Sequence, residues 1–382
     1  MRGEYILTAE NNSATNSQQP TANSYNFVPE RITEYDTLRA LLTILVVVGH
    51  STYYSILTEY GGVDYAGMMS AHGVNDSFVH KMLLVVTDAI YSFHMPLFMA
   101  LSGALFSRNK TRDFLPFVKS KAQRLLIPFV AVTSFVSVPL KYLAGYWDGS
   151  GNIFRDVFIG QYLIQGNTHL WFLVTLFCEF VIFYFVKKYF VGRKSKCLVL
   201  LLLFALNVAA RKINIILLRN VLSFSVWFYA GFLFEEIRNN FNGKISAVKF
   251  LSLSALWAVM FFSARYIQHD ALPAKMLHII LSLFITLSGI LSCYSFCVLL
   301  NNTRTSTSKP VRFLCDYSLG IYLYSDTFNY NILYIFVSLF TVQALSQNVC
   351  ALLLYVLRIC VTFSLAVFMT WFLRKMRFKF IA

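Results

Sequence analysis

The sequence has little charge and few polar stretches long enough to form a soluble domain. Only 13% of its 382 residues are Asp, Glu, Lys or Arg, whereas an ordinary soluble domain has about 25%. Acidic residues are the scarcer kind, with 18 against 33 basic ones. Hydrophobic residues make up 57% of the chain, and its mean hydropathy is +0.59. This balance excludes a soluble globular protein and indicates an integral membrane protein with several spans.

Motifs that would assign the chain to a familiar class of soluble enzyme are also missing. The seven cysteines are odd in number and include no CxxC pair, which argues against a disulfide framework and a zinc site. The sequence contains no GxSxG nucleophile elbow and no HExxH zinc motif. Its net charge of +15 lacks the interleaved aromatic residues of a nucleic-acid groove. We therefore expect no metal and no nucleic-acid partner.

Long apolar stretches fill most of the chain, and a stretch of about 20 residues is enough to cross a bilayer. They predict an all-α polytopic membrane protein with ten spans, at about 36–57, 82–106, 124–145, 169–190, 197–212, 213–234, 248–267, 276–300, 312–340 and 349–373. Residues 1–30 are rich in Asn, Ser, Thr and Gln and predict a disordered tail. Residues 31–375 are expected to form one membrane domain, and 376–382 a basic tail.

The distribution of Lys and Arg among the loops sets the predicted orientation. Most of these residues fall in the loops that share a side with both termini. Because short cytoplasmic loops are enriched in Lys and Arg, both termini and their tails are expected in the cytoplasm. The basic excess is then a consequence of topology. The expected location is a bacterial cytoplasmic (inner) membrane, which the chain crosses several times.

The first predicted span carries ionisable residues, which are rare in membrane helices. Arg39 and His50 are eleven residues apart, so they share one helix face and lie about 16 Å apart along its axis. With the N-terminus inside, Arg39 lies at the cytoplasmic mouth and His50 near mid-membrane. Asp36 precedes Arg39 by three residues and is placed to pair with it. Taken alone, Asp36 and Arg39 also fit an interfacial cap, and His50 a helix–helix hydrogen bond.

A second histidine and two further cations fall near these positions. His94 lies in the second span at a depth similar to that of His50, just before a proline that removes a backbone donor and opens space. Lys121 and Arg124 are one turn apart just before the third span, on the side of Arg39. Arg39, Lys121 and Arg124 would form a cationic cradle for a ligand with several phosphates.

Other polar residues in the spans have a structural and a functional interpretation. Ser102, which precedes a glycine, favours close helix packing. Trp171 suits the outer interface of the membrane. Glu179 and Asp326 each need a partner or a proton inside a bilayer, so both are candidates for the site.

Several blocks, in their order along the chain, resemble acyltransferase family 3 of membrane proteins. They are "YDTLRALLTILVVVGH", "FHMPLFMALSGALF", "KAQRLLIPF", "HLWFL", "FYAGFLFEE" and "YSLGIYLYS". Arg39 and His50 match the family's signature of Arg, ten residues and His. Lys121 stands where the family's basic-x-x-Arg motif more often has Arg. The last block ends in Ser325, where many members have His, and Asp326 follows it.

The resemblance implies ten helices and the transfer of an acyl group, usually acetyl, from cytoplasmic acyl-CoA to a hydroxyl. It implies that the acceptor is a lipid-linked or surface glycan, such as a polysaccharide. It also implies the stand-alone kind of enzyme, without an added extracytoplasmic hydrolase-like domain. The expected partners are therefore the lipid bilayer, acetyl-CoA or another acyl-CoA, and a glycan.

The residues themselves suit this chemistry. His50 could take the proton of the hydroxyl or carry the acyl group itself. His94 could donate to the developing oxyanion, and Glu179 offers another base. The cationic cradle would hold the phosphates of the donor. The alternative is a transporter or flippase for a glycan or lipid intermediate, since ten helices with buried charges suit it too. The lack of an inverted repeat disfavours it.

Overall fold

The computed structural model describes residues 31–110, 113–166, 168–267, 272–301 and 308–378. The predicted disordered tail at 1–30 and most of the basic tail, from 379 onward, lie outside the described residues. The chain from Thr33 onward forms one unit by its internal contacts. The account below concerns that unit.

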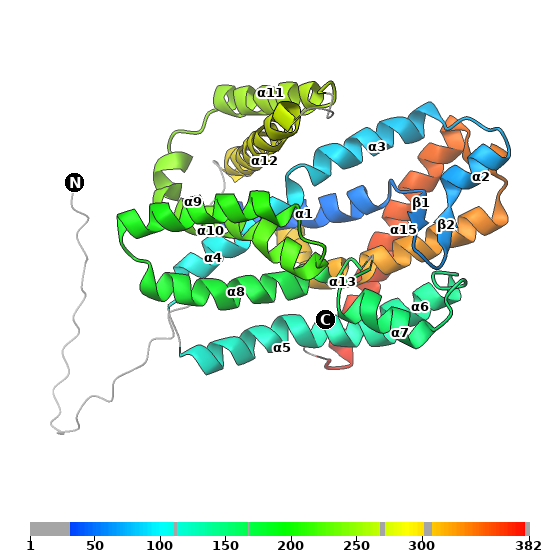
Figure 1. Ribbon diagram of the computed structural model, residues 1–382, viewed down its shortest axis with the longest axis horizontal. Coiled ribbons are helices and arrows are strands. Elements are labelled where there is room, and N and C mark those ends of the chain that lie inside the picture. Colours follow the sequence, from blue (N-terminus) through cyan, green and yellow to red (C-terminus); the bar gives the residue numbers. More distant parts are fainter. Residues whose placement is uncertain (1–30, 111–112, 167, 268–271, 302–307, 379–382) are drawn as a thin grey trace, which may run out of the picture. The chain divides into compact units, whose positions relative to one another are not determined.

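Nearly all of the described chain is helical, which confirms the predicted all-α class (Figure 1). In chain order the elements are α1 (Thr33–His50), β1 (Ser55–Leu57), β2 (Gly62–Asp64), α2 (Tyr65–Ala71), α3 (Phe78–Tyr91), α4 (His94–Arg108), α5 (Phe114–Val132), the π-helical turn η1 (Thr133–Ser137), α6 (Val138–Leu143), α7 (Ile153–Val157), the π-helical turn η2 (Phe158–Tyr162), α8 (Trp171–Tyr189), α9 (Arg193–Ala210), α10 (Ile216–Asn242), α11 (Ala247–Ala264), α12 (Leu272–Asn301), α13 (Lys309–Leu339), α14 (Val342–Leu345) and α15 (Asn348–Lys375). The strands β1 and β2 form an antiparallel hairpin in which Ile56 faces Val63.

Each predicted span overlaps a single helix or a series of two or three consecutive helical segments. Six stretches of the described chain are long and apolar enough to cross a membrane, namely Phe78–Arg108, Phe114–Leu143, Ile216–Asn242, Ala247–Ala264, Ala274–Asn301 and Asn348–Lys375. They confirm a polytopic membrane protein. The helices α1, α8, α9 and α13 occupy the other four predicted spans. Their crossing of the membrane stays a prediction, as does the orientation.

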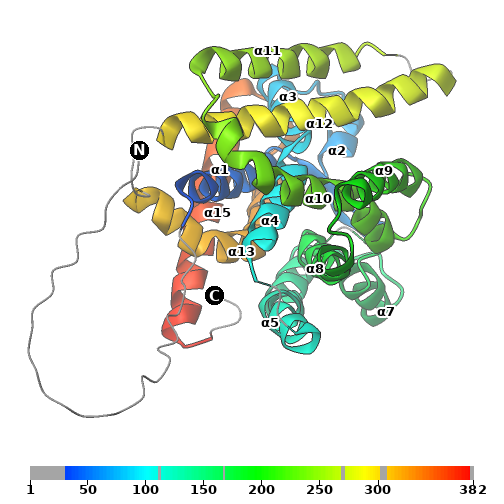
Figure 2. The ribbon, with the colours of Figure 1, turned by 90° about the vertical axis from the view of Figure 1, so that its left-hand side faces the viewer.

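The helix α1 lies in the middle of the bundle. Figure 2 shows it nearly end-on, with α4, α12, α13 and α15 around it, and all four contact it. The helices α11 and α12 pack against each other at one side. Since α1 touches most of the long helices, a residue at its end can meet side chains from distant parts of the sequence.

Two glycines explain the close crossing of α4 and α10. A Cβ atom on Gly103 would overlap the carbonyl oxygen of Phe228, and one on Gly231 would overlap that of Ala100. Each glycine therefore lets the backbone of the other helix approach. The close packing expected for Ser102 and the glycine that follows it fits this contact.

The first predicted span is too long at its outer end, because α1 ends at His50 and not near residue 57. The hydroxyl of Thr52 donates to the carbonyl oxygen of Gly49 in the last turn, and that of Ser51 adds a second donor to the carbonyl oxygen of Val47, which already accepts from the Ser51 backbone. The next residues then form the hairpin. This early end leaves His50 at the terminus of a helix, beside a turn.

The second and third spans also differ in detail from the prediction. The second span is broken between α3 and α4. Pro96 has no backbone N–H and cannot donate to the carbonyl of Ser92. The hydroxyl of Thr286 donates to that carbonyl instead, at 2.8 Å. The third begins earlier, at Phe114. Lys121 and Arg124 consequently lie inside α5 and not ahead of it. A proline two residues after Phe114 fits this early start, since a first turn needs no donor there.

Candidate active site

Asp326 in α13 is the centre of a polar cluster inside the bundle. Its Oδ1 atom lies 3.0 Å from Nδ1 of His50, at the end of α1. Its Oδ2 atom lies 3.1 Å from Nδ1 of His169, just before α8, and 3.6 Å from Nζ of Lys141 in α6. One carboxylate therefore joins four segments that are far apart in the sequence.

The contact with Asp326 fixes the orientation and tautomer of His50. Since a carboxylate accepts, Nδ1 of His50 carries the proton and donates, which leaves the lone pair of a neutral ring on Nε2. The exposed fraction of the side chain is 24% for His50 and 20% for Asp326, so small molecules can reach both. The ring of His50 is thus partly exposed, with a basic nitrogen on one side and a carboxylate that supports it on the other.

Tyr91, in the last turn of α3, lies against this ring without covering Nε2. Its hydroxyl is 3.3 Å from Nε2 and 3.5 Å from Nδ1 of His50. Because it is almost equidistant from both nitrogens, it lies over the ring or at the Cε1 edge between them, and not along the lone pair of Nε2. The hydroxyl also hydrogen-bonds with that of Tyr53. Tyr91 is therefore a polar donor beside the basic nitrogen.

Arg358 in α15 holds the end of α1 against α13. Its side chain is fully buried, and its guanidinium donates to the carbonyl oxygen of Tyr53 at 2.5 Å and to that of His50 at 3.4 Å. Its Nε donates to Oδ1 of Asn329 at 2.6 Å, and Nδ2 of Asn329 donates to the hydroxyl of Ser51 at 2.7 Å. Asn329 lies one turn after the site carboxylate on α13. The guanidinium thus sets the position of the His50 backbone relative to that carboxylate.

His169 and Lys141 complete the surroundings of Asp326. Nε2 of His169 lies 3.0 Å from the carbonyl oxygen of Leu323, so both ring nitrogens face acceptors. Only a ring with a proton on each nitrogen would donate to both. Lys141 is buried, with 3% of its side chain exposed, and its ammonium also lies 4.8 Å from the centre of the Tyr146 ring. The carboxylate of Asp326 therefore has the ammonium of Lys141 as a cationic neighbour.

His94 lies in the same region but has no direct contact with Asp326 or with the side chains that contact Asp326. It begins α4, is buried, and its Nδ1 donates to the carbonyl oxygen of Ile90 at 3.0 Å. The ring of Tyr91 lies between the two histidines, with its centre 4.6 Å from that of His94 and 6.0 Å from that of His50. With Nδ1 protonated, a neutral His94 has no further N–H. It could donate to an oxyanion only after gaining a proton.

Two members of the cationic cradle lie close to each other. Arg39 is half-buried in α1 and Arg124 is exposed in α5, and their charges interact. None of the ion pairs among the described residues includes Arg39 or Arg124, so the predicted pair of Asp36 with Arg39 is not among them. Asp36 is itself buried. Two like charges without a counter-charge are arranged to receive an anion.

Lys121, the third member of the cradle, points toward aromatic rings. Its ammonium lies 3.6 Å from the centre of the Phe180 ring and 5.6 Å from that of Phe117. A cation over a ring face is attracted by the negative face of that ring. Aromatic rings therefore hold the ammonium of Lys121 in place.

The remaining predicted residues lie outside the Asp326 cluster. Glu179 is buried in α8, where its carboxylate oxygens accept from the hydroxyl of Ser225 at 3.1 and 3.0 Å. Ser102 donates to the carbonyl of its own helix, four residues back. Trp171 stacks on Phe224 with the ring centres 5.2 Å apart. These contacts are typical of helix packing and of hydrogen bonds that satisfy buried polar groups.

Sequence reasoning missed the partners of Asp326. Lys141, His169 and Tyr91 had no role in the site predicted from the sequence. Only the tertiary fold brings these residues together, but one signal was present, because an acid inside a predicted span demands a cationic partner. Ser325, which stands where many family members have His, is buried, and its hydroxyl has no hydrogen-bond partner within the described part of the chain.

Comparison with known proteins assigns the chain to a family. The acyltransferase domain family matches residues 32–374, nearly the whole described chain. Nodulation protein NolL of Sinorhizobium fredii (strain NBRC 101917 / NGR234) is 27% identical over 231 residues, which cover 59% of this chain and 54% of that protein. Nodulation protein NolL of Mesorhizobium japonicum (strain LMG 29417 / CECT 9101 / MAFF 303099) is 31% identical over 156 residues, or 39% of this chain and 34% of the relative. The chain thus spans about half or less of these relatives. No solved structure matches it significantly.

Proposed function

This chain belongs to acyltransferase family 3, and we propose that it is a membrane O-acyltransferase that moves an acetyl group from cytoplasmic acetyl-CoA to a hydroxyl of a lipid-linked or surface glycan. The observation that carries this proposal is the contact of His50 with Asp326, which leaves a basic Nε2 on a ring that is 24% exposed. The family supplies the reaction class. The acceptor class is the one that the sequence resemblance implies, and the bacterial inner membrane is the location expected from the sequence.

Transfer begins with proton removal from the acceptor hydroxyl. Nε2 of His50 takes this proton while the hydroxyl oxygen attacks the carbonyl carbon of the thioester. The imidazolium that forms donates from Nδ1 to Asp326, which stabilises the positive charge. The carboxylate of Asp326 stays deprotonated throughout the reaction.

The tetrahedral intermediate needs a donor for its negative oxygen. The hydroxyl of Tyr91 lies beside the ring of His50 and is a better placed donor than the already engaged Nδ1 of His94. Collapse of the intermediate breaks the carbon–sulfur bond, and the proton on Nε2 passes to the leaving thiolate. The products are the ester and free CoA. An acyl-histidine intermediate would use the same nitrogen of His50 as the nucleophile.

The donor is held from the cytoplasmic side. Arg39 and Arg124 are close together without an acidic partner within the described chain, and guanidinium groups bind phosphate with two parallel hydrogen bonds. Arg39 lies about 16 Å from His50 along α1. An extended pantetheine arm would cover this distance, with the phosphates at the arginines and the thioester at His50.

The direct test is release of CoA thiol by the purified full-length protein in lipid nanodiscs, with acetyl-CoA and a lipid-linked glycan fraction. The proposal expects acceptor-dependent thiol release in the wild type and a loss of at least about 100-fold with His50→Ala. A transporter of glycans or lipids would release no thiol above background in either protein. That outcome would contradict the proposal.

A further inference from the structure

A short turn at 92–93 joins α3 to α4, directly after Tyr91 and directly before His94. Phe93, the residue before α4, has no side-chain oxygen with which to cap that helix, so its own side chain cannot fix the turn. The hydroxyl of Ser92 donates to the carbonyl oxygen of Ala89 at 2.7 Å, which closes the end of α3. The remaining contacts of the turn come from other helices.

Two side chains from α11 and α12 bind Ser92. The indole N–H of Trp257 in α11 donates to the hydroxyl oxygen of Ser92 at 3.2 Å. The hydroxyl of Thr286 in α12 donates to the carbonyl oxygen of the same serine at 2.8 Å. The two partners lie 165 and 194 residues from Ser92 in the sequence. The hydroxyl and the carbonyl of one turn residue are therefore both held by distant helices.

Phe93, the other residue of the turn, is held by packing. A Cβ atom on Gly289 of α12 would lie 2.8 Å from the Cβ atom of Phe93, so Phe93 occupies the space that a side chain at Gly289 would need. The Phe93 ring also meets the ring of Trp257 edge to face, with the ring centres 6.0 Å apart. Val85 and Ala89 of α3 pack on the same apolar cluster as Trp257. Together α11 and α12 clasp the turn.

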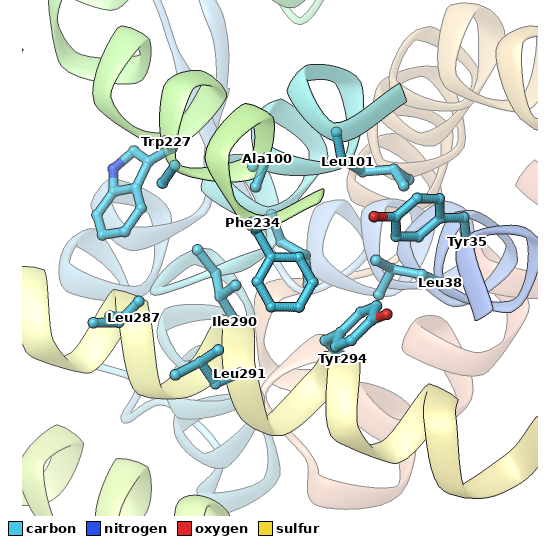
Figure 3. Close-up of a pocket in the computed structure, with 14 residues that line it drawn as sticks. Tyr35, Leu38, Ala100, Leu101, Trp227, Phe234, Leu287, Ile290, Leu291 and Tyr294 are labelled. Atoms are coloured by element: carbon cyan, nitrogen blue, oxygen red, sulfur yellow. The ribbon is translucent and has the colours of Figure 1, made fainter. Parts of the chain in front are cut away.

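Helix α12 is also fixed to α1, which carries the proposed base. The side-chain amide of Asn301, at the end of α12, donates to the hydroxyl oxygen of Thr37 in α1 at 2.9 Å. Between Asn301 and the clasp, Leu287 and Ile290 of α12 point into an apolar pocket that α1, α4 and α10 also line (Figure 3). One helix thus contacts both α1 and the turn, and it sets the position of the turn relative to α1.

The turn in its turn determines where the Tyr91 ring lies. That ring rests on Gly49 of α1, where an added Cβ atom would be 3.1 Å from Cε2 of Tyr91. The tyrosine hydroxyl then lies 3.3 Å from Nε2 of His50. Because Ser92 follows Tyr91 directly in the chain, a shift of the serine backbone moves the tyrosine hydroxyl relative to Nε2.

We propose that Thr286 and Trp257 are positioning residues for acyl transfer, because they hold the 92–93 turn and thereby keep the hydroxyl of Tyr91 beside Nε2 of His50. This inference rests on the proposed function, in which that hydroxyl donates to the oxyanion. Neither residue contributes a group to the reaction. An oxyanion donor acts only at the correct distance, and a misplacement of about 1 Å costs up to about 100-fold in rate.

The position of the hydroxyl is measured by ¹⁹F NMR of the full-length protein in nanodiscs, with 3-fluorotyrosine in place of Tyr91. Thr286→Val keeps the shape of the side chain and removes its donor, so we expect the fluorine signal to shift or broaden. Thr286→Ser keeps the donor and should give the wild-type signal. Thr362→Val is the matched control, because the Thr362 hydroxyl is buried with no hydrogen-bond partner among the described residues. An unchanged signal in Thr286→Val would overturn the proposal, whatever the activity of the protein.

Kinetics separate a positioning role from a general loss of structure. Thr286→Val should lower kcat by about ten-fold and leave the KM for acetyl-CoA unchanged, since the cationic cradle is not altered. Trp257→Phe keeps an aromatic ring, loses the N–H and should act in the same direction. If Thr286→Val does not fold, Trp257→Phe serves in both measurements.

A double-mutant cycle shows whether the effect passes through Tyr91. In a Tyr91→Phe background, neither Thr286→Val nor Trp257→Phe should lower kcat further. A further loss as large as that in the wild-type background would overturn the proposal, because the two residues would then act elsewhere. Absence of thiol release by the wild type would contradict the proposed function instead, and the fluorine signal would still decide whether these residues position the tyrosine.

Discussion

Nδ1 of His50 and Oδ1 of Asp326 lie 3.0 Å apart, although 275 residues of chain separate α1 from this part of α13. The carboxylate faces Nδ1 and leaves Nε2 as the basic nitrogen of a neutral ring. In the proposed mechanism, the first predicted span supplies the base and the ninth supplies the group that orients it.

This contact predicts that Asp326→Asn is severely impaired in transfer. An amide has nearly the shape of the carboxylate but can donate to Nδ1, which favours the wrong tautomer and removes the stabilising charge. We expect kcat to fall by about 10²–10⁴-fold with little change in the KM for acetyl-CoA. Ser325→Ala is the matched control and should keep activity near that of the wild type. A kcat for Asp326→Asn within about three-fold of wild type would exclude the orienting role.

Arg358 is predicted to act through the position of His50. Arg358→Lys keeps the charge but loses the fork that serves Asn329 and two backbone carbonyls together. We expect about a ten-fold or larger loss in kcat, an unchanged affinity for CoA and a lower thermal midpoint of unfolding, because buried acceptors are left unpaired. Kinetics, calorimetry of CoA binding and thermal unfolding in detergent measure these effects. A variant that loses stability but keeps full kcat would show that the residue only supports the fold.

The cationic cradle is predicted to bind the donor. Arg39→Ala and Arg124→Ala should each weaken CoA binding by about 10–100-fold, the range for hydrogen bonds to charged groups. Lys121→Ala should have a smaller effect, since its ammonium lies over the Phe180 ring and gives only a point charge. Isothermal titration of the purified protein with CoA measures the affinities. Arginine variants with wild-type affinity would place the phosphates elsewhere.

The orientation of the chain is a separate prediction. A reporter fused after Lys196 should be read in the cytoplasm, and one inserted in the loop at 146–165 should be read outside. The basis is the bias of Lys and Arg toward one side of the membrane. Detection of both reporters on the same side would rule out the ten-span arrangement.

The fold was predictable where local pattern determines it. Apolar stretches of about 20 residues marked every long helix, since the bilayer demands that length. Helix ends were less predictable, because they depend on distant partners. The end of α1 at His50, for example, is stabilised by Arg358, which lies in the last long helix. Likewise, Thr286 on α12 serves the carbonyl that Pro96 leaves free.

The candidate site was predictable only in part for the same reason. The spacing of Arg39 and His50 is visible in one helix, and Asp326 stood out as an acid inside a span. Its neighbours Lys141 and His169 resemble ordinary interfacial residues in the sequence, because nothing local distinguishes a residue that faces the bundle interior from one that faces a headgroup. Their assembly depends on the packing of α6, α8 and α13.

The most direct test of the account is acetyl transfer by His50→Gln under saturating acetyl-CoA. A glutamine can keep the hydrogen bond to Asp326 and much of the packing, but an amide cannot take the proton of the acceptor hydroxyl. The account predicts intact CoA binding and a rate of glycan acetylation at least about 100-fold below that of the wild type. Acetylation by His50→Gln near the wild-type rate would contradict it and would make His50 a packing residue.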